Sequence, residues 1–356
     1  MRVLITGICG FVGSSIAQWL RGRDASIQVL GLDNFLRTGS ESNRTKLRSF
    51  GVDVRHGDIR NASDFETLPS VDWVIDAAAV PGVLAGVDGV TSSRQLLEHN
   101  LQGTVNILEY CKRTSAGLVL LSTSRVYGIH DLASLPLTTR AGAFQLDATQ
   151  PLPVGISARG IGPDFSMSAP VSLYGSTKRA SEILALEYGE TFAMPVWINR
   201  CGVLAGAGQF GTAEQGIFSF WVHAYARKRP LRYIGFHGAG YQVRDAFHPD
   251  DLAALIFTQM TGSHSQNERI FNIGGGAENA MSLAQLTKWC AARFGTHAVA
   301  SDPTPRPFDI PWLVMDYSRA TDVFGWRPQR SMETILEDLK MHAEQNHQWL
   351  ELTGGM

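Results

Sequence analysis

The chain has few cysteines, little net charge and no long apolar run. Only four of its 356 residues are cysteine, 18% are charged, and the formal net charge is −2. Cys9, Cys111, Cys201 and Cys290 show no C-x-x-C spacing, so we predict buried, reduced thiols in a cytoplasmic protein. No basic run indicates nucleic-acid binding, and no apolar segment approaches the ~20 residues of a membrane span. We therefore expect neither nucleic acid nor a membrane as a partner.

The sequence also contains no internal repeat and no metal-binding motif. The ten histidines include no H-E-x-x-H pattern, so no metal site is expected. No signal peptide is predicted, because the first apolar run, residues 3–5, is short and belongs to the first predicted strand. A hydrophobic content of 44% over this length predicts a globular protein of one or two domains.

A glycine-rich turn follows the first apolar segment. Residues 2–6 predict a buried parallel strand, and Gly7, Gly10 and Gly13 lead into a helical pattern over residues 11–23. Such a turn presents backbone N–H groups and the positive end of a helix dipole to a pyrophosphate. The glycine spacing is similar to that of the extended short-chain dehydrogenase/reductase superfamily. The pattern predicts a Rossmann-type, doubly wound α/β sheet that binds a dinucleotide.

Acidic and small residues follow the next predicted strands. The strand over residues 27–32 ends in Asp33, which can bind the adenosine ribose and repel a further phosphate, so NAD is favoured over NADP. Arg37 is interpreted as a solvated loop charge rather than a 2′-phosphate ligand. The strand over 52–59 places Asp58 at the adenine, with a strand-end cap as an equal alternative. The strand over 73–79 ends in alanines that suit the nicotinamide but leave that wall without an extra polar group.

A helical stretch is predicted over residues 99–114. Asn100, in its first turn, is expected to support the central sheet. The residues predicted to contact the cofactor are Gly7, Gly10, Phe11, Val12, Gly13, Asp33, Asn34, Asp58, Ile59, Ala77, Ala78, Ala79, Asn100, Tyr174 and Lys178.

Tyr174 and Lys178 lie four residues apart, on one face of a predicted helix. A free phenol ionises near pH ~10, and a neighbouring cation lowers that value, so the pair suits proton transfer at a nicotinamide. The strand over residues 118–122 delivers Thr123 at the sheet edge where such folds bind ligands. We predict that Thr123, Tyr174 and Lys178 are the catalytic residues.

The composition changes twice further along the chain. Residues 129–169 are rich in Pro, Gly, Ser and Ala, and we expect a substrate lid or an intersubunit arm rather than disorder. Tyr127 and Tyr174, which flank this connection, are both expected to face a sugar. Residues 1–200 are predicted to form the NAD-binding domain, with 243–260 returning to it. Residues 201–242 and 261–356 then form a smaller α/β substrate lobe.

Three segments resemble one family within this superfamily. Residues 209–216 (QFGTAEQG), 240–245 (GYQVRD) and 248–252 (HPDDL) are similar to the CDP-paratose 2-epimerases, also called CDP-tyvelose 2-epimerases. The resemblance implies NAD, a nucleotide-diphosphate sugar with a CDP-sugar favoured over a UDP-sugar, and inversion at C2. It departs at Gly208 and Cys201, where an arginine and a histidine are expected.

Several arginines are expected at the substrate. The resemblance assigns Arg244 to the substrate diphosphate, and its planar multi-donor group suits phosphate oxygens; the alternative is a salt bridge to Asp245 or Asp251. Phe271 is interpreted either as a border of the substrate base or as ordinary core. The residues predicted to bind substrate are Ser124, Arg125, Arg200, Gln209, Arg244 and Arg306.

The residue type at position 125 also distinguishes between the possible reactions. Dehydratases and decarboxylases of this superfamily use an acid just after the hydroxyl residue, and position 125 is not an acid. Epimerisation by transient oxidation to a ketone is therefore favoured. The alternatives are a UDP-sugar 4-epimerase and a non-catalytic NAD-binding scaffold protein. A homodimer or homotetramer is expected.

Overall fold

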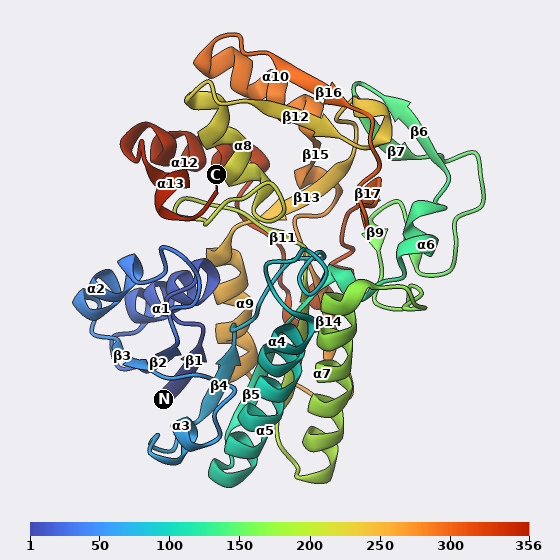
Figure 1. Cartoon of the computed structure of the whole chain (residues 1–356). Coiled ribbons are helices and arrows are strands. Elements are labelled where there is room, and N and C mark those ends of the chain that lie inside the picture. Colours follow the sequence, from blue (N-terminus) through green and yellow to red (C-terminus); the bar gives the residue numbers. More distant parts are fainter. Residues whose placement is uncertain (356) are drawn as a thin grey trace.

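A seven-stranded, all-parallel sheet forms the base of the molecule (Figure 1). The computed structural model describes residues 1–355. In spatial order the strands are β3 (Asp53–His56), β2 (Gln28–Asp33), β1 (Arg2–Thr6), β4 (Trp73–Asp76), β5 (Gly117–Thr123), β10 (Val196–Cys201) and β14 (Ile270–Ile273). The order reverses beside β1, which is the arrangement of a Rossmann-type fold. The predicted fold class is therefore confirmed.

Helices cover both faces of this sheet because its strands are apolar on both sides. In β1, Val3 and Ile5 belong to one buried cluster and Leu4 to the other. The first face carries α1 (Phe11–Arg23), α2 (Ser42–Ser49), α9 (Pro249–Thr261) and α11 (Ser318–Phe324). The second carries α3 (Ser63–Glu66), α4 (Ser93–Leu97), the π-helical turn η1 (Glu98–Gln102), α5 (Gly103–Thr114) and α7 (Ser172–Thr191).

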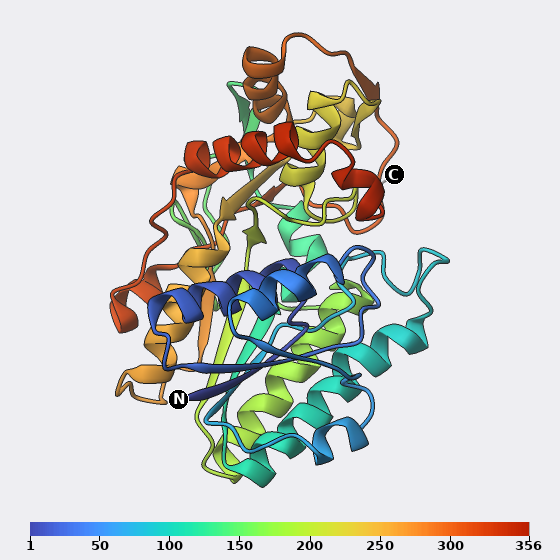
Figure 2. The ribbon, with the colours of Figure 1, turned by 90° about the vertical axis from the view of Figure 1, so that its left-hand side faces the viewer.

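A second lobe lies across the carboxyl end of the main sheet (Figures 1 and 2). Its central sheet contains β11 (Val203–Leu204), β13 (Val243–Phe247), β15 (Ala280–Ser282) and β17 (Trp312–Leu313), and β12 (Leu231–Ile234) pairs with β16 (Val299–Asp302). Its helices are α8 (Ile217–Ala226), α10 (Leu283–Phe294), α12 (Met332–Gln345) and α13 (Trp349–Leu352), with short 3-10 turns η3 (Phe236–Gly238) and η4 (Ala277–Asn279).

The connection between β5 and α7 is ordered, so the alternative of plain disorder is wrong. After the 3-10 turn η2 (Ser124–Val126) it forms α6 (Ile129–Ala133), β6 (Leu137–Arg140), β7 (Ala143–Leu146), β8 (Ile156–Ser157) and β9 (Gly160–Ile161). Its apolar side chains share a buried cluster with residues 310–315 of the lobe. The roles of lid and intersubunit arm stay predictions.

Three other boundaries differ from those expected. β14 completes the main sheet although residues 261–356 were assigned to the lobe, and β13 joins the lobe sheet although 243–260 were expected to return. Only α9 makes that return, by packing against α1. The helical stretch expected from residue 99 begins at Ser93, where the Ser92 side chain caps the first turn. Among residues 1–355, no helix combines the length and apolarity needed to cross a membrane.

Candidate active site

The turn between β1 and α1 accepts only glycine at its key positions. Gly7 has a positive φ of 64°, and a Cβ there would lie 2.9 Å from the Ala77 carbonyl oxygen. A Cβ on Gly13 would lie 2.4 Å from the Gly7 carbonyl oxygen. No side chain caps α1 at Gly10, so its first N–H groups, at Phe11, Val12 and Gly13, face the space above the turn. This cradle fits the diphosphate of a dinucleotide.

Asp33 closes the turn from the end of β2. Its carboxylate accepts hydrogen bonds from the Cys9 and Phe35 backbone N–H groups, both at 2.8 Å. Burial raises the pKa of Asp33, while these two hydrogen bonds and the nearby His56 act in the opposite direction. A buried carboxylate fixed beside the glycine turn suits ribose hydroxyls and disfavours a 2′-phosphate.

Arg37 is not a solvated loop charge, so the interpretation made from the sequence was wrong. Its Nη2 donates to the Phe210 carbonyl oxygen at 3.1 Å, and its guanidinium lies 6.0 Å from the centre of the Phe210 ring. Arg37 therefore joins the cofactor half of the molecule to the lobe.

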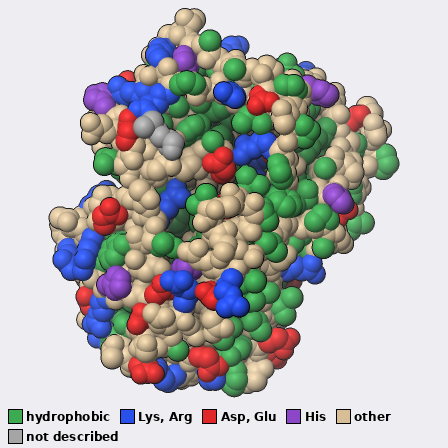
Figure 3. All heavy atoms as spheres, in the orientation of Figure 1, with side chains coloured by type: hydrophobic (Ala, Val, Ile, Leu, Met, Phe, Trp, Pro, Cys, Tyr) green, Lys and Arg blue, Asp and Glu red, His purple; other side chains and the backbone are tan. Residues whose placement is uncertain are grey.

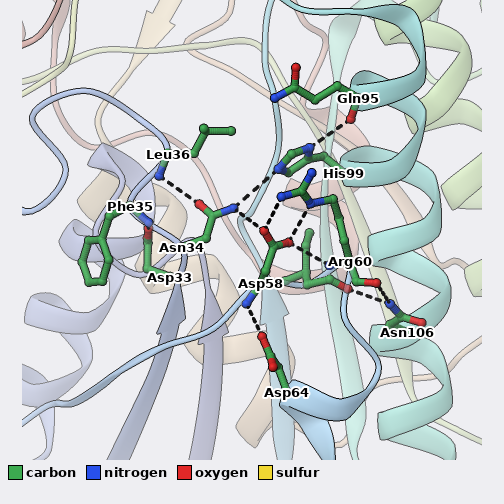
Figure 4. Close-up of polar contacts among 11 residues, drawn as sticks. Asp33, Asn34, Phe35, Leu36, Asp58, Arg60, Asp64, Gln95, His99 and Asn106 are labelled. Atoms are coloured by element: carbon green, nitrogen blue, oxygen red, sulfur yellow. Dashed lines mark hydrogen bonds and ion pairs between the residues drawn. The ribbon is translucent and has the colours of Figure 1, made fainter.

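Asn34 and Asp58 belong to a polar network just beyond the ends of β2 and β3, where the sequence predicts the adenosine of the cofactor (Figure 4). Asn34 Nδ2 donates to Asp58 Oδ2 at 3.0 Å, and Arg60 forms an ion pair with the same oxygen at 2.7 Å. Burial tends to raise the pKa of Asp58, but the hydrogen bonds from Arg60 and Asn34 outweigh it, so the pKa lies well below its ordinary value. The carboxylate is held ionised. Ile59 is buried against Gly103 of α5.

The loop after β4 is fixed by Asn100, as its predicted supporting role requires. Asn100 Oδ1 accepts the Val80 N–H at 2.8 Å, and its Nδ2 donates to the Val80 carbonyl at 3.0 Å and to Thr177 Oγ1 at 3.3 Å. The amide thus ties the loop that carries Ala77, Ala78 and Ala79 to the helix that carries Tyr174. Asn100 lies in the π-helical turn η1, which the sequence pattern did not reveal.

A buried carboxylate directly precedes the three alanines in the sequence. Asp76, the last residue of β4, is buried, and its Oδ1 accepts a hydrogen bond from Thr6 Oγ1 at 2.8 Å. Burial raises the pKa of Asp76, and the charge of Lys178 is the largest effect acting against it. An aspartate as the last residue of an apolar strand was the signal that could have identified this group.

Thr123, Tyr174 and Lys178 converge at the carboxyl end of β5. Thr123 is the last residue of β5, and Tyr174 and Lys178 lie in successive turns of α7. Burial raises the pKa of Tyr174, opposed by its hydrogen bond with Thr123 and by the charge of Arg125; a Cys201 thiolate would raise it further. Lys178 is only 2% exposed. The structure thus assembles a hydroxyl, a phenol and an amine beside the cofactor cradle.

Three arginines lie near one another between the two lobes, Arg125 from η2 after β5 and Arg244 and Arg306 from the lobe. Arg244 Nη2 pairs with Asp309 Oδ1 at 3.1 Å, and Arg306 lies 3.8 Å from Glu214. Arg125 makes one long hydrogen bond, to the Phe308 carbonyl at 3.4 Å. The space-filling view is hollowed between the two lobes, and basic side chains appear there (Figure 3). This concentration of positive charge suits a diphosphate.

The alternative partners considered for Arg244 were wrong. Asp245 points away into the core, where its Oδ2 accepts N–H groups of Gly276 and Met315. Asp251 accepts the Arg330 N–H instead. The actual partner, Asp309, was missed because it lies 65 residues away in the sequence.

Two predicted substrate contacts are contradicted by burial. Arg200 forms a buried ion pair with Glu182 (Nη2 to Oε2, 2.7 Å), and its Nη1 donates to Tyr127 and to the Pro163 carbonyl. Tyr127 is fully buried and donates to Asn272 Oδ1 at 2.6 Å. Both side chains hold β10 to its neighbours, so neither is positioned to meet a sugar.

The other three residues with a predicted substrate role, Phe271, Ser124 and Gln209, are all buried. Phe271 is fully buried beside Trp197, as its core interpretation expected. Ser124 is buried in η2. Gln209 Nε2 donates to the Leu204 carbonyl at 2.5 Å, while its Oε1 is buried without a hydrogen-bond partner among residues 1–355. The substrate roles of Ser124 and Gln209 stay predictions.

Residues 3–274 match the NAD dependent epimerase/dehydratase family. The chain belongs to this family. A CDP-paratose 2-epimerase from Salmonella typhi is 28% identical over 341 residues, covering 93% of this chain and 96% of that protein. A UDP-glucuronate 4-epimerase from Thermodesulfobacterium geofontis is 25% identical and covers 96% of each chain. Family membership confirms that the protein is an enzyme and that NAD is its cofactor.

Solved structures support the same architecture. The crystal structure of UDP-glucuronic acid 4-epimerase from Bacillus cereus, bound to UDP-glucuronic acid and NAD, superposes with a TM-score of 0.77 over 97% of this chain and 99% of that one. The identity is 23%, so this likeness shows the fold. UDP-glucose 4-epimerase from Thermus thermophilus in complex with NAD has a TM-score of 0.72 at 25% identity, covering 97% and 99% of the two chains.

Proposed function

We propose that this epimerase/dehydratase family member is a nucleotide-sugar epimerase that inverts C2 of a CDP-sugar by way of a ketone. The observation that carries the proposal is the meeting of Thr123, Tyr174 and Lys178 between the glycine cradle and the arginine cluster. Bound NAD+ would supply a hydride acceptor and, later in the cycle, a hydride donor. The cradle of Gly7, Gly10 and Gly13 holds its diphosphate.

The side chains of the site have separate roles in proton transfer and in substrate binding. Tyr174, as a phenolate, takes the proton of the sugar hydroxyl, while the Thr123 hydroxyl hydrogen-bonds the developing alkoxide and then the ketone. Lys178 binds the cofactor ribose and supplies positive charge to this part of the pocket. Arg244 keeps the diphosphate anchored while the flat ketone turns its other face to the cofactor. Tyr174 then returns the proton.

The choice of C2 and CDP follows the relative with 28% identity, which is a CDP-paratose 2-epimerase. The second candidate is inversion at C4 of a UDP-sugar, favoured by the similarity to UDP-glucuronate 4-epimerases. Both use the same proton and hydride transfers and differ in how the sugar is placed. The predicted homodimer or homotetramer and the predicted cytoplasmic location stay predictions.

The proposal is tested by incubating the purified protein with CDP-paratose, UDP-glucuronic acid and UDP-glucose in parallel. Proton NMR reports which carbon is inverted. We expect turnover of the CDP-sugar with inversion at C2 and without added cofactor, because net redox change is zero. Turnover restricted to a UDP-sugar with inversion at C4 would replace the proposal with its alternative.

A further inference from the structure

We propose that Glu182 is a positioning residue, which fixes α7 against the ends of β5 and β10 and thereby places Tyr174 opposite Thr123. Glu182 is buried, with 2% of its surface exposed, and it acts through the helix rather than by contact with the sugar. The inference rests on the proposed function, because it concerns the residues that exchange a proton with the substrate. It gives a role in the reaction to a residue that the sequence motifs did not single out.

Glu182 continues the row of α7 residues that carries the site. Tyr174, Lys178 and Glu182 follow one another at intervals of four residues, so they lie along one side of the helix. Lys178 is also buried, so this row faces the interior. At about 1.5 Å per residue, Glu182 lies about 12 Å along the helix axis from Tyr174. A helix bends little over two turns, so a contact that fixes Glu182 along the axis also fixes Tyr174.

The Glu182 carboxylate joins two strand ends. Its Oε1 accepts the Ser122 hydroxyl at 2.5 Å and Arg200 Nε at 3.0 Å, and its Oε2 accepts Arg200 Nη2 at 2.7 Å. Ser122 and Arg200 are register partners on β5 and β10, and each is the last residue but one of its strand. Thr123 follows Ser122 directly. The carboxylate is therefore tied to both strands one residue before the hydroxyl that the mechanism uses.

The first turn of α7 leaves little room for movement. A Cβ on Gly175 would lie 2.2 Å from the Arg125 carbonyl oxygen, so the backbone of α7 approaches η2 very closely there. Gly175 directly follows Tyr174. This contact and the Glu182 carboxylate therefore hold α7 at two levels along its axis. The tyrosine between them needs an exact position, because a misplacement of about 1 Å can cost a reaction about 10²-fold in rate.

Stability alone does not account for an ion pair at this place. Arg200 is as deeply buried as Glu182, and apolar side chains of similar volume often replace a buried ion pair without loss of stability. A charged pair with directional hydrogen bonds instead selects one relative position of its two elements. The remaining contacts of Arg200 do not involve α7, because its Nη1 donates to Tyr127 Oη at 3.3 Å and to the Pro163 carbonyl at 3.0 Å. The two sides of the guanidinium can therefore be tested separately.

The test replaces the ion pair and follows turnover and stability separately in the NAD-loaded protein. Glu182→Leu/Arg200→Met removes both charges together, so neither stays buried alone. Glu182→Gln/Arg200→Met keeps an acceptor for the Ser122 hydroxyl. Tyr127→Phe is the matched control, because it removes a hydroxyl from the other side of Arg200 and leaves the Glu182 contacts in place. For each variant, kcat, KM, bound NAD and the melting temperature are measured with whichever nucleotide sugar the parent inverts.

We expect Glu182→Leu/Arg200→Met to lower kcat about 10–100-fold, while KM, NAD content and melting temperature stay near the parental values. Glu182→Gln/Arg200→Met should recover most of the loss, and Tyr127→Phe should keep the parental kcat. A parental kcat in the folded Leu/Met variant would overturn the inference. A loss that Gln does not recover, or an equal loss in Tyr127→Phe, would overturn it too.

Ser122→Ala decides the question if the paired variants do not fold. It removes only the hydroxyl that donates to Glu182, so kcat should fall about three- to tenfold at unchanged KM. An unchanged kcat in this variant would contradict the positioning role. Because the sugar is the one that the parent inverts, at C2 or at C4, the result is independent of which reaction the enzyme catalyses.

Discussion

The cofactor half and the substrate half of the site satisfy their polar groups in different ways. In the cofactor half, both oxygens of Asp33 accept backbone N–H groups and Asp58 is paired with Arg60. In the substrate half, Arg244 donates to Asp309 and to the Val243 and Ile310 carbonyls, whereas Arg125 has one long hydrogen bond and Arg306 one distant carboxylate. The first half is organised by the protein alone, because it meets the same cofactor in every cycle. The second retains unsatisfied charge on Arg125 and Arg306, beside an Arg244 that the protein already holds.

The largest effect should come from the base that lies between these halves. Tyr174→Phe removes one oxygen and keeps the ring, and general acid–base groups typically contribute ~10²–10⁴-fold to rate. We expect turnover to fall within that range while circular dichroism and bound NAD stay unchanged. A variant within a few-fold of the parent would remove Tyr174 from the mechanism.

A change in the cofactor half should act on cofactor retention. Gly13→Ala brings a Cβ to 2.4 Å from the Gly7 carbonyl, so we expect the purified variant to lose its NAD. Gly22→Ala, in the same helix, is the matched control, because a Cβ at Gly22 meets nothing within 4 Å. NAD is measured in the protein-free extract by its reduction with an added dehydrogenase. Full NAD content in Gly13→Ala would show that the turn is not the cradle.

A change in the substrate half should act on substrate affinity instead. Arg244→Met removes charge-assisted hydrogen bonds, each worth about 1.5–3 kcal/mol, so KM should rise about 10–100-fold with a smaller change in kcat. NAD content should stay at the parental level. Arg306→Met should raise KM less, since Arg306 lies in the more exposed part of the cluster. A fall in kcat at unchanged KM would contradict the anchoring role of Arg244.

The smallest effect concerns the protonation of a buried carboxylate, Asp245. Asp245 in the lobe has one oxygen without a hydrogen-bond partner, and burial raises its pKa from the ordinary 3.8 to about 7. The folded protein therefore holds this proton more tightly than the unfolded chain. The resulting stabilisation is complete below pH about 4 and is lost as pH rises to about 7.

Asp245→Asn carries no titrating proton, so it should remove this part of the pH dependence. Thermal unfolding at several pH values, compared between parent and variant, measures the difference. We expect the variant to gain stability relative to the parent as pH rises through this window, by a few degrees in midpoint. Parallel curves would show that Asp245 does not titrate as its burial requires.

The difference between local and long-range contacts explains which features of the structure could be predicted from the sequence. The strands, the glycine turn and the convergence of Thr123 with Tyr174 follow from local periodicity and from the shared edge of parallel strands. Pairings between distant residues left no local signal: Glu182 neutralises Arg200 from another element, and Asp309 meets Arg244 from 65 residues away. From the sequence alone, an arginine at a strand end that faces the core therefore cannot be distinguished from one that faces the cleft.

The internal structure of the connection over residues 129–169 could not be predicted from the sequence for a related reason. Its Pro-, Gly- and Ser-rich composition gives no helix or strand period, yet Phe165 and Ile161 pack against residues 310–315. Ile161 N donates to the Val314 carbonyl at 2.8 Å. Order here comes from a partner far along the chain, which composition does not report.

The most direct test of the central claim follows the hydrogen at the inverted carbon. We expect a CDP-sugar carrying deuterium at C2 to be inverted with its label retained, because the hydrogen leaves and returns as hydride within the site. The same label at C4 should be inert. Exchange of the C2 deuterium into solvent water would contradict hydride transfer, and inversion at C4 alone would show that the UDP-sugar alternative is the correct function.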